Sequence, residues 1–157
     1  MRTAVLTIST RASRREADDT SGPLLAELAE AAGADVQAME VLPDDRALIE
    51  DRLRTYVDDG FALIFTTGGT GLTPDDVTPE ATRAVIEREA PGFAEAMRAE
   101  ARRQTPMGIL TRGMAGSAGT TFIVNFPGSP KAVRELFPVV APTLGHVVDT
   151  LRGHSRH

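Results

Sequence analysis

The sequence predicts an α/β fold: a doubly wound, mostly parallel sheet with helices on both faces. Short apolar segments alternate with segments of helical periodicity along the whole chain. The most apolar segment, Phe61–Phe65, contains no polar residue, which is typical of a central strand covered on both sides. Helices that connect such strands give a parallel sheet. The length of 157 residues suits one domain covering residues 1–157.

The individual elements follow from local signals. Strands are expected at residues 4–8, 35–42, 61–65, 108–111 and 120–126. Helices are expected at residues 22–33, 44–59, 79–89, 91–104 and 129–151. Ser21 is the expected N-cap of the first helix and Gly33 its end, and Thr78 is expected to cap the helix that starts at Pro79. Two internal prolines are expected to interrupt the last helix.

Composition narrows the classes of function. The net charge of -5 argues against a general nucleic-acid or membrane-surface role, so neither partner is expected. The absence of cysteine excludes disulfides, thiolate metal sites and cysteine nucleophiles. No apolar run approaches a membrane span and no signal peptide is apparent, so a cytoplasmic location is expected. With only 4% aromatic residues, aliphatic side chains and alanine are expected to fill the interior.

The segment TTGGTGLTPDD (residues 66–76) directly follows the most apolar strand. Its glycines, Gly68, Gly69 and Gly71, allow positive φ and close approach of the backbone to a ligand. In a turn between a strand and a helix, backbone N–H groups form a cradle for phosphate oxygens. Four hydroxyls reinforce this interpretation over that of a simple tight turn: Thr66, Thr67, Thr70 and Thr73. The segment is neither a Walker A motif nor a dinucleotide fingerprint.

Two pairs of carboxylates follow expected strands. Asp75 and Asp76 end the glycine-rich segment, and helix capping is an equally good explanation for either one alone. Together, beside a phosphate cradle, they are favourable only if a divalent cation lies between them and the phosphates, which predicts a Mg²⁺–nucleotide site. Asp44 and Asp45 are expected at the same edge of the sheet, although the residues alone favour an N-cap with a first-turn acid for that pair.

A third segment, NFPGSPKAV, again joins a strand to a helix through a glycine turn. Gly128 lets the chain bend, and Ser129 can cap the helix or bind an anion. Lys131 in the first helical turn is unfavourable with the helix dipole, which hints at an anionic ligand. The histidines, at positions 146, 154 and 157, are interpreted as surface residues with no role.

Taken together, these segments resemble the MogA/MoaB family of molybdenum-cofactor biosynthesis proteins. The resemblance covers nearly the whole chain and lies in TISTRAS, DDTSGP, LPDD, TTGGTGLTPDDVTPEAT, PGFAEAMR and TRGMAGSAGTTFIVNFPGSPKAV. It implies the molybdopterin-binding fold, commonly in a homotrimer. Active members transfer AMP from Mg-ATP to the terminal phosphate of molybdopterin and release pyrophosphate. The product is used for molybdate insertion, which makes the molybdenum-insertion protein an implied partner.

The resemblance also assigns site residues. It places the two functional aspartates of the family, as catalytic residues and metal ligands, on Asp44 and Asp76. The implied nucleotide- and phosphate-binding residues are Thr67, Gly68, Gly69, Thr70, Gly71 and Asp75. The implied molybdopterin-binding residues are Ser9, Thr111, Gly113, Gly116, Asn125, Pro127, Gly128 and Ser129.

The chain departs from the family pattern at five positions. Thr10 stands where the family often has Asp or Asn, and Arg15 stands where a glycine is common. Thr111 and Gly113 replace serines, and Ala118 replaces a basic residue. Two alternatives therefore stand beside an adenylyltransferase: a molybdopterin-binding paralogue that holds or delivers the cofactor without catalysis, and a nucleotide-dependent regulatory protein.

Overall fold

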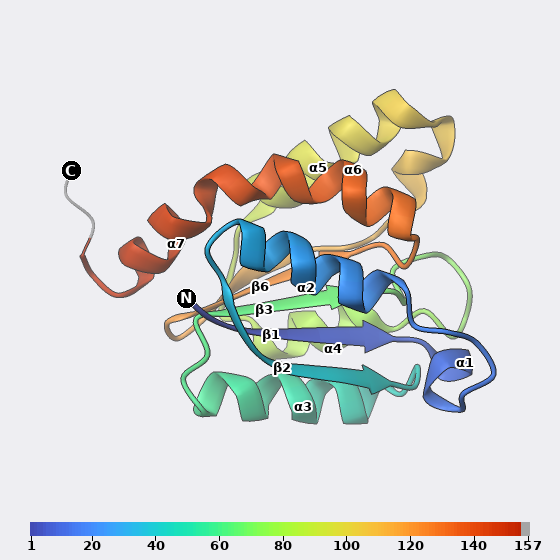
Figure 1. The fold of residues 1–157 in the computed structure, drawn as a ribbon, viewed down its shortest axis with the longest axis horizontal. Coiled ribbons are helices and arrows are strands. Elements are labelled where there is room, and N and C mark those ends of the chain that lie inside the picture. The colour runs from blue at the N-terminus through green and yellow to red at the C-terminus, as the bar shows by residue number, and fades with distance from the viewer. Residues whose placement is uncertain (155–157) are drawn as a thin grey trace.

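The computed structural model describes residues 1–154 and contains a six-stranded sheet between two layers of helices (Figure 1). The strands are β1 (Arg2–Ile8), β2 (Asp35–Leu42), β3 (Leu63–Thr67), β4 (Arg88–Glu89), β5 (Ala115–Ala118) and β6 (Thr121–Phe126). Their order is β2-β1-β3-β6-β5-β4. The pairs β2–β1, β1–β3 and β3–β6 are parallel, whereas β5 is antiparallel to both of its neighbours, β6 and β4. The predicted mostly parallel α/β sheet is confirmed.

The helices are α1 (Thr10–Ser13), α2 (Ser21–Ala31), α3 (Arg46–Asp58), α4 (Thr78–Val85), α5 (Pro91–Gln104), α6 (Pro130–Val140) and α7 (Leu144–Leu151). The 3-10 helix η1 (Pro106–Leu110) follows α5, and a second 3-10 helix, η2 (Ala141–Thr143), joins α6 to α7. No helix within residues 1–154 is long and apolar enough to cross a membrane.

Each face of the sheet buries its own core. Alternation along β3 directs Leu63 and Phe65 to one face and Ile64 to the other. The first face packs against α2, α5, α6 and α7, and the second against α3 and α4 (Figure 1). Because both faces are covered, the central strand β3 is entirely buried, as its lack of polar alternation predicts.

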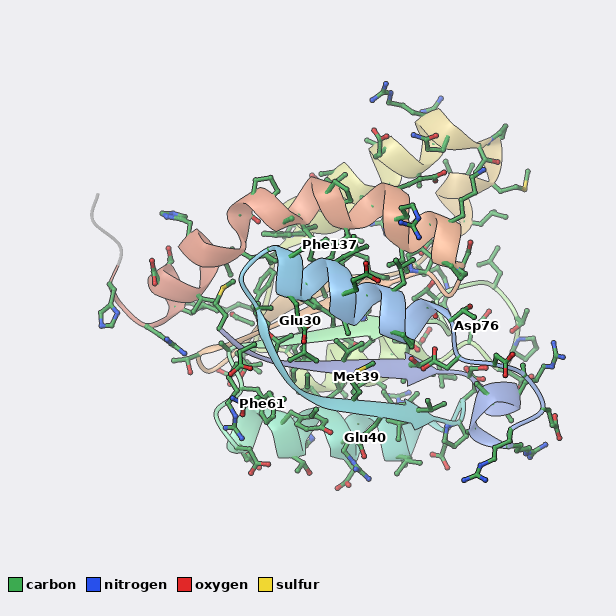
Figure 2. The ribbon with its side chains drawn as sticks, viewed as in Figure 1. Glu30, Met39, Glu40, Phe61, Asp76 and Phe137 are labelled. Atoms are coloured by element: carbon green, nitrogen blue, oxygen red, sulfur yellow. The ribbon has the colours of Figure 1, made fainter. Side chains whose placement is uncertain are left out.

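Aliphatic side chains and alanine make up most of both cores, as expected, and the larger core also contains a group of phenylalanines. Phe65, Phe126 and Phe137 form a mutual cluster with ring centroids 5.8 to 5.9 Å apart. Phe137 extends from α6 toward the sheet (Figure 2). Since a phenylalanine buries more apolar surface than an aliphatic residue, a few of them anchor α6 on the sheet.

Two expected elements in the third quarter of the chain are wrong. Residues 108–111 form the end of η1 and not a strand, while the glycine-rich stretch beyond them contains strand β5. A Cβ at Gly116 would lie 2.5 Å from the carbonyl oxygen of Arg88, so glycine is what allows β4 to pair with β5. The helix expected at 79–89 ends at Val85 because residues 88–89 join the sheet.

Helix ends also differ in detail from the expectation. Ser21 is the first residue of α2 and not its cap; Asp19 Oδ1 accepts from the N–H of Gly22 at 3.0 Å. Thr78 does not cap α4, since its hydroxyl donates to the carbonyl of Gly68 at 2.9 Å. The chain does interrupt its last helical region at η2, but α6 continues through Pro138. The predicted end of α2 is confirmed, with Gly33 at φ +92°.

Candidate functional site

A cavity of about 750 Å³ opens at the carboxyl ends of β1 and β3, beside α1. Asp76 lies at this end of the sheet, beyond the tips of the parallel strands (Figure 2). Ligands of open α/β sheets bind at such an edge. The cavity lining contains eight of the predicted site residues: Ser9, Asp44, Thr67, Gly68, Gly69, Asp75, Asp76 and Gly128.

Glycines bring the loops after β1, β3 and β6 into contact below this cavity. Gly68 (φ +100°) has its N–H bonded to the carbonyl of Phe126 at 3.0 Å. A Cβ on Gly68 would lie 2.3 Å from the carbonyl oxygen of Ile8, and a Cβ on Gly128 would lie 3.2 Å from the Cα of Gly68. Gly69 also has positive φ (+67°), whereas Gly71 does not. The glycines thus pack the chain against itself as well as opening its backbone to a ligand.

Asp44 enters the cavity from the loop after β2 and is held by Thr10. Its Oδ2 accepts from the Thr10 backbone N–H at 3.1 Å and from the Thr10 hydroxyl at 2.9 Å. The Asp44 N–H donates in turn to the same hydroxyl at 2.9 Å. Its neighbour Asp45 caps α3 by accepting from the N–H of Leu48 at 3.1 Å. The two acids of this pair therefore have separate roles, one in the cavity and one at the helix end.

Asp76 is held by its own loop. Its Oδ2 accepts from the backbone N–H of Thr73 at 3.1 Å and from the Thr73 hydroxyl at 3.0 Å. Asp76 therefore closes a local turn and does not cap α4, while Asp75 is exposed at the cavity rim. The carboxylate is thus fixed relative to its own loop, and Asp76 lines the cavity.

The acidic residues of the cavity fit a Mg²⁺ ion that arrives with a nucleotide. Within residues 1–154, no group of three or more His, Cys, Asp or Glu residues could hold a metal ion by itself. Asp44 and Asp76 can supply carboxylate oxygens from two sides of the same cavity. Mg²⁺ is commonly held in this way, by one or two carboxylates together with phosphate and water oxygens.

Sequence reasoning missed the basic side of the cavity. Arg11 and Arg14, from α1 and its C-terminal end, both line it and are exposed. Neither of them was assigned a role from the sequence; Arg11 lies within the TISTRAS segment of the family resemblance. Thr73, whose hydroxyl was expected to support a phosphate cradle, also lines the cavity. The other lining residues not assigned to the site in advance are Thr7, Ile8, Thr10, Ala12, Asp18, Asp19, Thr20 and Ser21. They belong to the TISTRAS and DDTSGP segments, and the hydroxyls and acids of DDTSGP, which precede a helix, could have indicated them.

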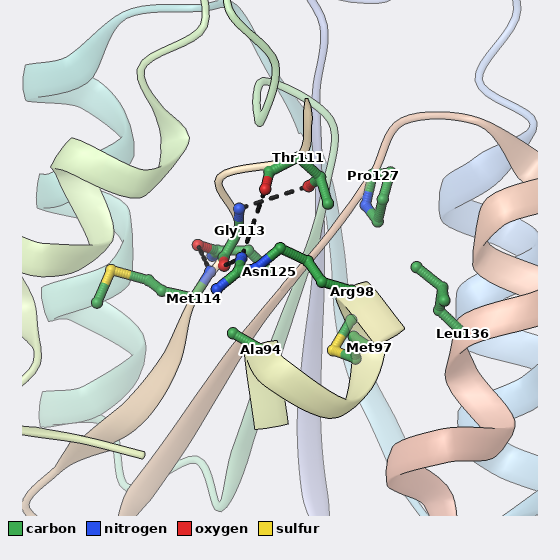
Figure 3. Close-up of a pocket in the computed structure, with 9 residues that line it drawn as sticks. All are labelled: Ala94, Met97, Arg98, Thr111, Gly113, Met114, Asn125, Pro127 and Leu136. Atoms are coloured by element: carbon green, nitrogen blue, oxygen red, sulfur yellow. Dashed lines mark hydrogen bonds between the residues drawn. The ribbon is translucent and has the colours of Figure 1, made fainter. Parts of the chain in front are cut away.

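Most of the residues expected to bind molybdopterin line two further pockets, separate from the main cavity. Thr111, Gly113, Asn125 and Pro127 line a small pocket of about 10 Å³ together with Arg98 (Figure 3). A shallower cavity of about 230 Å³ adjoins it and is lined by Thr111, Pro127, Ser129 and Lys131 among others. Lys131 is exposed, and its ammonium lies 3.8 Å from the carboxylate of Glu135. This carboxylate offsets the charge of Lys131, so an anionic ligand is not needed to explain the lysine.

Several predicted site residues use their polar groups within the protein. The amide of Asn125 donates to the hydroxyls of Thr66 and Thr82, both at 3.0 Å, and its oxygen accepts from Met114 N–H at 3.2 Å. The Thr67 hydroxyl donates to the carbonyl of Pro127 at 2.7 Å. Asn125 therefore contributes to the order of the buried framework beneath the site.

Three predicted residues lie outside the linings of these cavities. Thr70 is buried, and its hydroxyl accepts from that of Thr111 at 3.2 Å. Gly71 presents its carbonyl to Arg112 at 2.7 Å. Gly116 lies within β5, paired with Glu89 and Ile123. His146 and His154 are exposed, as expected, and His157 lies outside the described residues.

Known proteins share this fold and these segments. A family model described as a probable molybdopterin binding domain matches residues 4–146. The chain belongs to the MogA/MoaB family of molybdopterin-binding proteins. A crystal structure of the molybdopterin biosynthesis enzyme MoaB from Thermus thermophilus is 44% identical, has a TM-score of 0.91, and covers 97% of this chain and 96% of that one.

Among curated relatives, the molybdopterin adenylyltransferase of Helicobacter pylori is 39% identical over 96% of this chain and 87% of its own length. The molybdenum cofactor synthesis protein cinnamon of Drosophila melanogaster is 42% identical over 92% of this chain, which spans only 24% of that protein. This MogA/MoaB protein is therefore a molybdopterin-binding protein of molybdenum-cofactor biosynthesis.

Proposed function

We propose that this MogA/MoaB protein is a molybdopterin adenylyltransferase that transfers AMP from Mg-ATP to the terminal phosphate of molybdopterin. The observation that carries the proposal is the cavity at the sheet edge, where Asp44, Asp76 and the Gly68–Gly69 turn meet. The adenylyltransferase from Helicobacter pylori, at 39% identity, supports the same activity.

The residues of the cavity suit a reaction that depends on positioning and charge. An ionised oxygen of the molybdopterin phosphate forms a bond to the α-phosphorus of ATP, and the bond to pyrophosphate breaks. Because the attacking oxygen is already deprotonated at pH 7, no general base is required. The Gly68 N–H is used within the protein, so the backbone N–H of Gly69 and the side chains of Arg11 and Arg14 would bind and orient the phosphates.

The two aspartates would hold the cation. Mg²⁺, when bound, supplies neutralisation of the charge that develops on the departing pyrophosphate. Thr10 keeps Asp44 in place, and Thr73 keeps Asp76 in place, so neither carboxylate needs to reorganise when substrate arrives. The pockets around Thr111, Pro127 and Ser129 would bind the pterin side of molybdopterin.

The alternative is a molybdopterin-binding paralogue that holds or delivers the cofactor without adenylylation. The departure at Gly113 favours it, because Gly113 lines the small pocket and lacks the hydroxyl of the serine common in the family, whereas Thr111 retains one. The sequence retains both aspartates and the glycine-rich turn, and the aspartates line the cavity together with Gly68 and Gly69; we infer that the catalytic activity is retained with them.

We further propose that the protein works as a homotrimer and passes its product to a molybdenum-insertion protein. Large apolar side chains on η1 support an assembly: Met107 and Ile109 are each 63% exposed.

The proposed activity is tested by measuring pyrophosphate release from Mg-ATP with and without molybdopterin. We expect release only when molybdopterin is present, and a loss of at least about 100-fold in the Asp76→Asn variant, since a preorganised charged group is removed from the reaction. Asp45→Asn is the matched control, because Asp45 caps α3 outside the cavity lining and asparagine is an equally good N-cap. Binding of molybdopterin without any pyrophosphate release by the wild-type protein would establish the carrier instead.

A further inference from the structure

Arg112 connects three parts of the chain next to the proposed site. It lies in the segment between η1 and β5. Its Nε donates to the carbonyl of Gly71 at 2.7 Å, its Nη2 donates to the carbonyl of Asp76 at 2.9 Å, and its Nη1 forms an ion pair with Glu80. The backbone N–H of Arg112 adds a fourth bond, to the carbonyl of Thr70 at 2.8 Å.

These contacts hold the two ends of one exposed loop. The loop runs from Gly71 to Asp76, and its residues 72–75 are all exposed, with Leu72 at 66%. The hydrogen bonds within the loop join Thr73 and Asp76: the Asp76 carboxylate accepts from the N–H and hydroxyl of Thr73, and the Asp76 N–H donates to the Thr73 carbonyl. That internal turn fixes the Asp76 carboxylate relative to the loop but not relative to the cavity. Arg112 fixes the position of the loop relative to the cavity, because it ties both loop ends to the segment that leads into β5.

The charge of Glu80 keeps the guanidinium in place. Glu80 lies in the first turn of α4, and its hydrogen bond with Arg112 lowers the pKa of the Glu80 carboxyl below its ordinary value. The carboxylate is therefore ionised over the neutral range and holds one edge of the planar guanidinium. The remaining N–H groups of Arg112 then point at the two loop carbonyls, which is a geometry that a lysine ammonium cannot reproduce.

We propose that Arg112 is a positioning residue for adenylyl transfer: it sets the location of the 71–76 loop, and so of the Asp76 carboxylate, without contacting the substrate. Arg112 is absent from the lining of the main cavity, whereas Asp76 is part of it. The catalytic consequence rests on the proposed function, but the consequence for the loop does not.

The first experiment measures hydrogen exchange in the ligand-free protein and is independent of turnover. The amides of Thr73 and Asp76 are hydrogen-bonded inside the loop and report its order. In Arg112→Lys we expect both amides to exchange at least about tenfold faster, since roughly the equivalent of one charged hydrogen bond is lost. Unchanged exchange in this variant would overturn the proposal.

Arg54→Lys is the matched control. Like Arg112, Arg54 forms both an ion pair, with Glu50, and a hydrogen bond to a backbone carbonyl, that of Ala84 at 2.8 Å. Ala84 lies at the end of α4 that is remote from the loop. It should leave the exchange of Thr73 and Asp76 unchanged. Glu80→Gln keeps the two carbonyl contacts of Arg112 and should give an intermediate acceleration, which makes the test independent of whether Arg112→Lys folds.

The second experiment compares pyrophosphate release. We expect Arg112→Lys to lower kcat at least about tenfold while the KM for molybdopterin changes less than about twofold, because only the placement of Asp76 is altered. Wild-type kcat in Arg112→Lys would overturn the catalytic part. Absence of turnover in the wild-type protein would instead refute the proposed function and leave the hydrogen-exchange result as the test of the loop.

Discussion

At the scale of single residues, two departures from the family pattern have structural consequences. Thr10 occupies a place where the family often has Asp or Asn, and here its hydroxyl both donates to Asp44 Oδ2 and accepts from the Asp44 N–H. Arg15 occupies a place where glycine is common, and its φ of +58° lies in the left-handed region. The first departure keeps a site residue in place, whereas the second introduces local strain.

Replacing Thr10 by valine should misplace Asp44. The substitution preserves shape but removes the hydroxyl, which leaves the Asp44 carboxylate with the backbone N–H as its remaining donor from Thr10. We expect a loss of about 1 kcal/mol in the free energy of unfolding and a roughly tenfold lower rate of pyrophosphate release. Urea unfolding and turnover measure the two effects. Thr10→Asn, which retains a donor, should keep more activity; equal activity in the valine variant and the wild type would refute the role of the hydroxyl.

Replacing Arg15 by glycine should stabilise the protein slightly. Left-handed backbone costs a non-glycine residue about 1–2 kcal/mol, and glycine loses about 0.5–1 kcal/mol to the greater entropy of the unfolded chain. The net gain in the free energy of unfolding is about 0.5 kcal/mol, measurable by urea denaturation. Arg14→Gly is the comparison: Arg14 has φ -90°, so glycine at this position should lower the free energy of unfolding. A loss in Arg15→Gly equal to that in Arg14→Gly would contradict the argument from strain.

At the scale of elements, edge strand β2 is joined to α3 by a polar network. Glu40 on β2 accepts from the Tyr56 hydroxyl and pairs with Arg52, both of α3. The pKa of Tyr56 is raised from 10.0 to about 12, mainly by burial and secondly by the hydrogen bond to Glu40. Glu40 and Met39 occupy neighbouring positions of β2, and α3 runs beside this strand (Figure 2). This network makes the packing of α3 sensitive to alkaline pH.

The stability of the protein should fall between pH 10 and pH 12. In this window the unfolded chain loses the Tyr56 proton while the folded protein retains it, so the stabilisation present below pH 10 is lost as the pH rises. Tyr56→Phe should be less stable than the wild type at pH 8, because it lacks the bond to Glu40, and should show a smaller decline above pH 10. Thermal unfolding across this range measures both effects. Parallel decline of the two proteins would show that Tyr56 does not contribute.

At the scale of the whole molecule, the sheet edge that holds the candidate site is built from segments far apart in the chain. Loops after β1, β2, β3 and β6 meet there, and the 111–114 segment supports one of them. The side chains of Met107 and Ile109, on η1, are exposed on the surface of the single chain. An apolar surface of this kind is commonly covered in an oligomer.

If the protein is a homotrimer, the particle has a mass of about 50 kDa, three times that of the 16.7 kDa chain. Light scattering on the eluting peak of a size-exclusion column measures this mass directly. The mass should remain unchanged on dilution if the assembly is stable. A particle with the mass of one chain at all concentrations would contradict the trimer without affecting the proposed chemistry.

The sequence by itself determined the fold class and the place of the glycine-rich turn, because these depend on local periodicity and on residue types that tolerate few alternatives. Local patterns did not separate a site role of the aspartates from helix capping, and their assignment to the site came from the family resemblance. The sequence also missed β5, since a strand of small residues has little intrinsic preference for a sheet and owes its pairing to the close approach of β4. Only the tertiary structure decided that Asp44 is held by Thr10, that the Asn125 amide is used within the protein, and that Arg112 ties down the loop of Asp76. These contacts join residues 34, 43 and 36 positions apart. Their partners are set by how the strands and loops pack together, which no local pattern encodes.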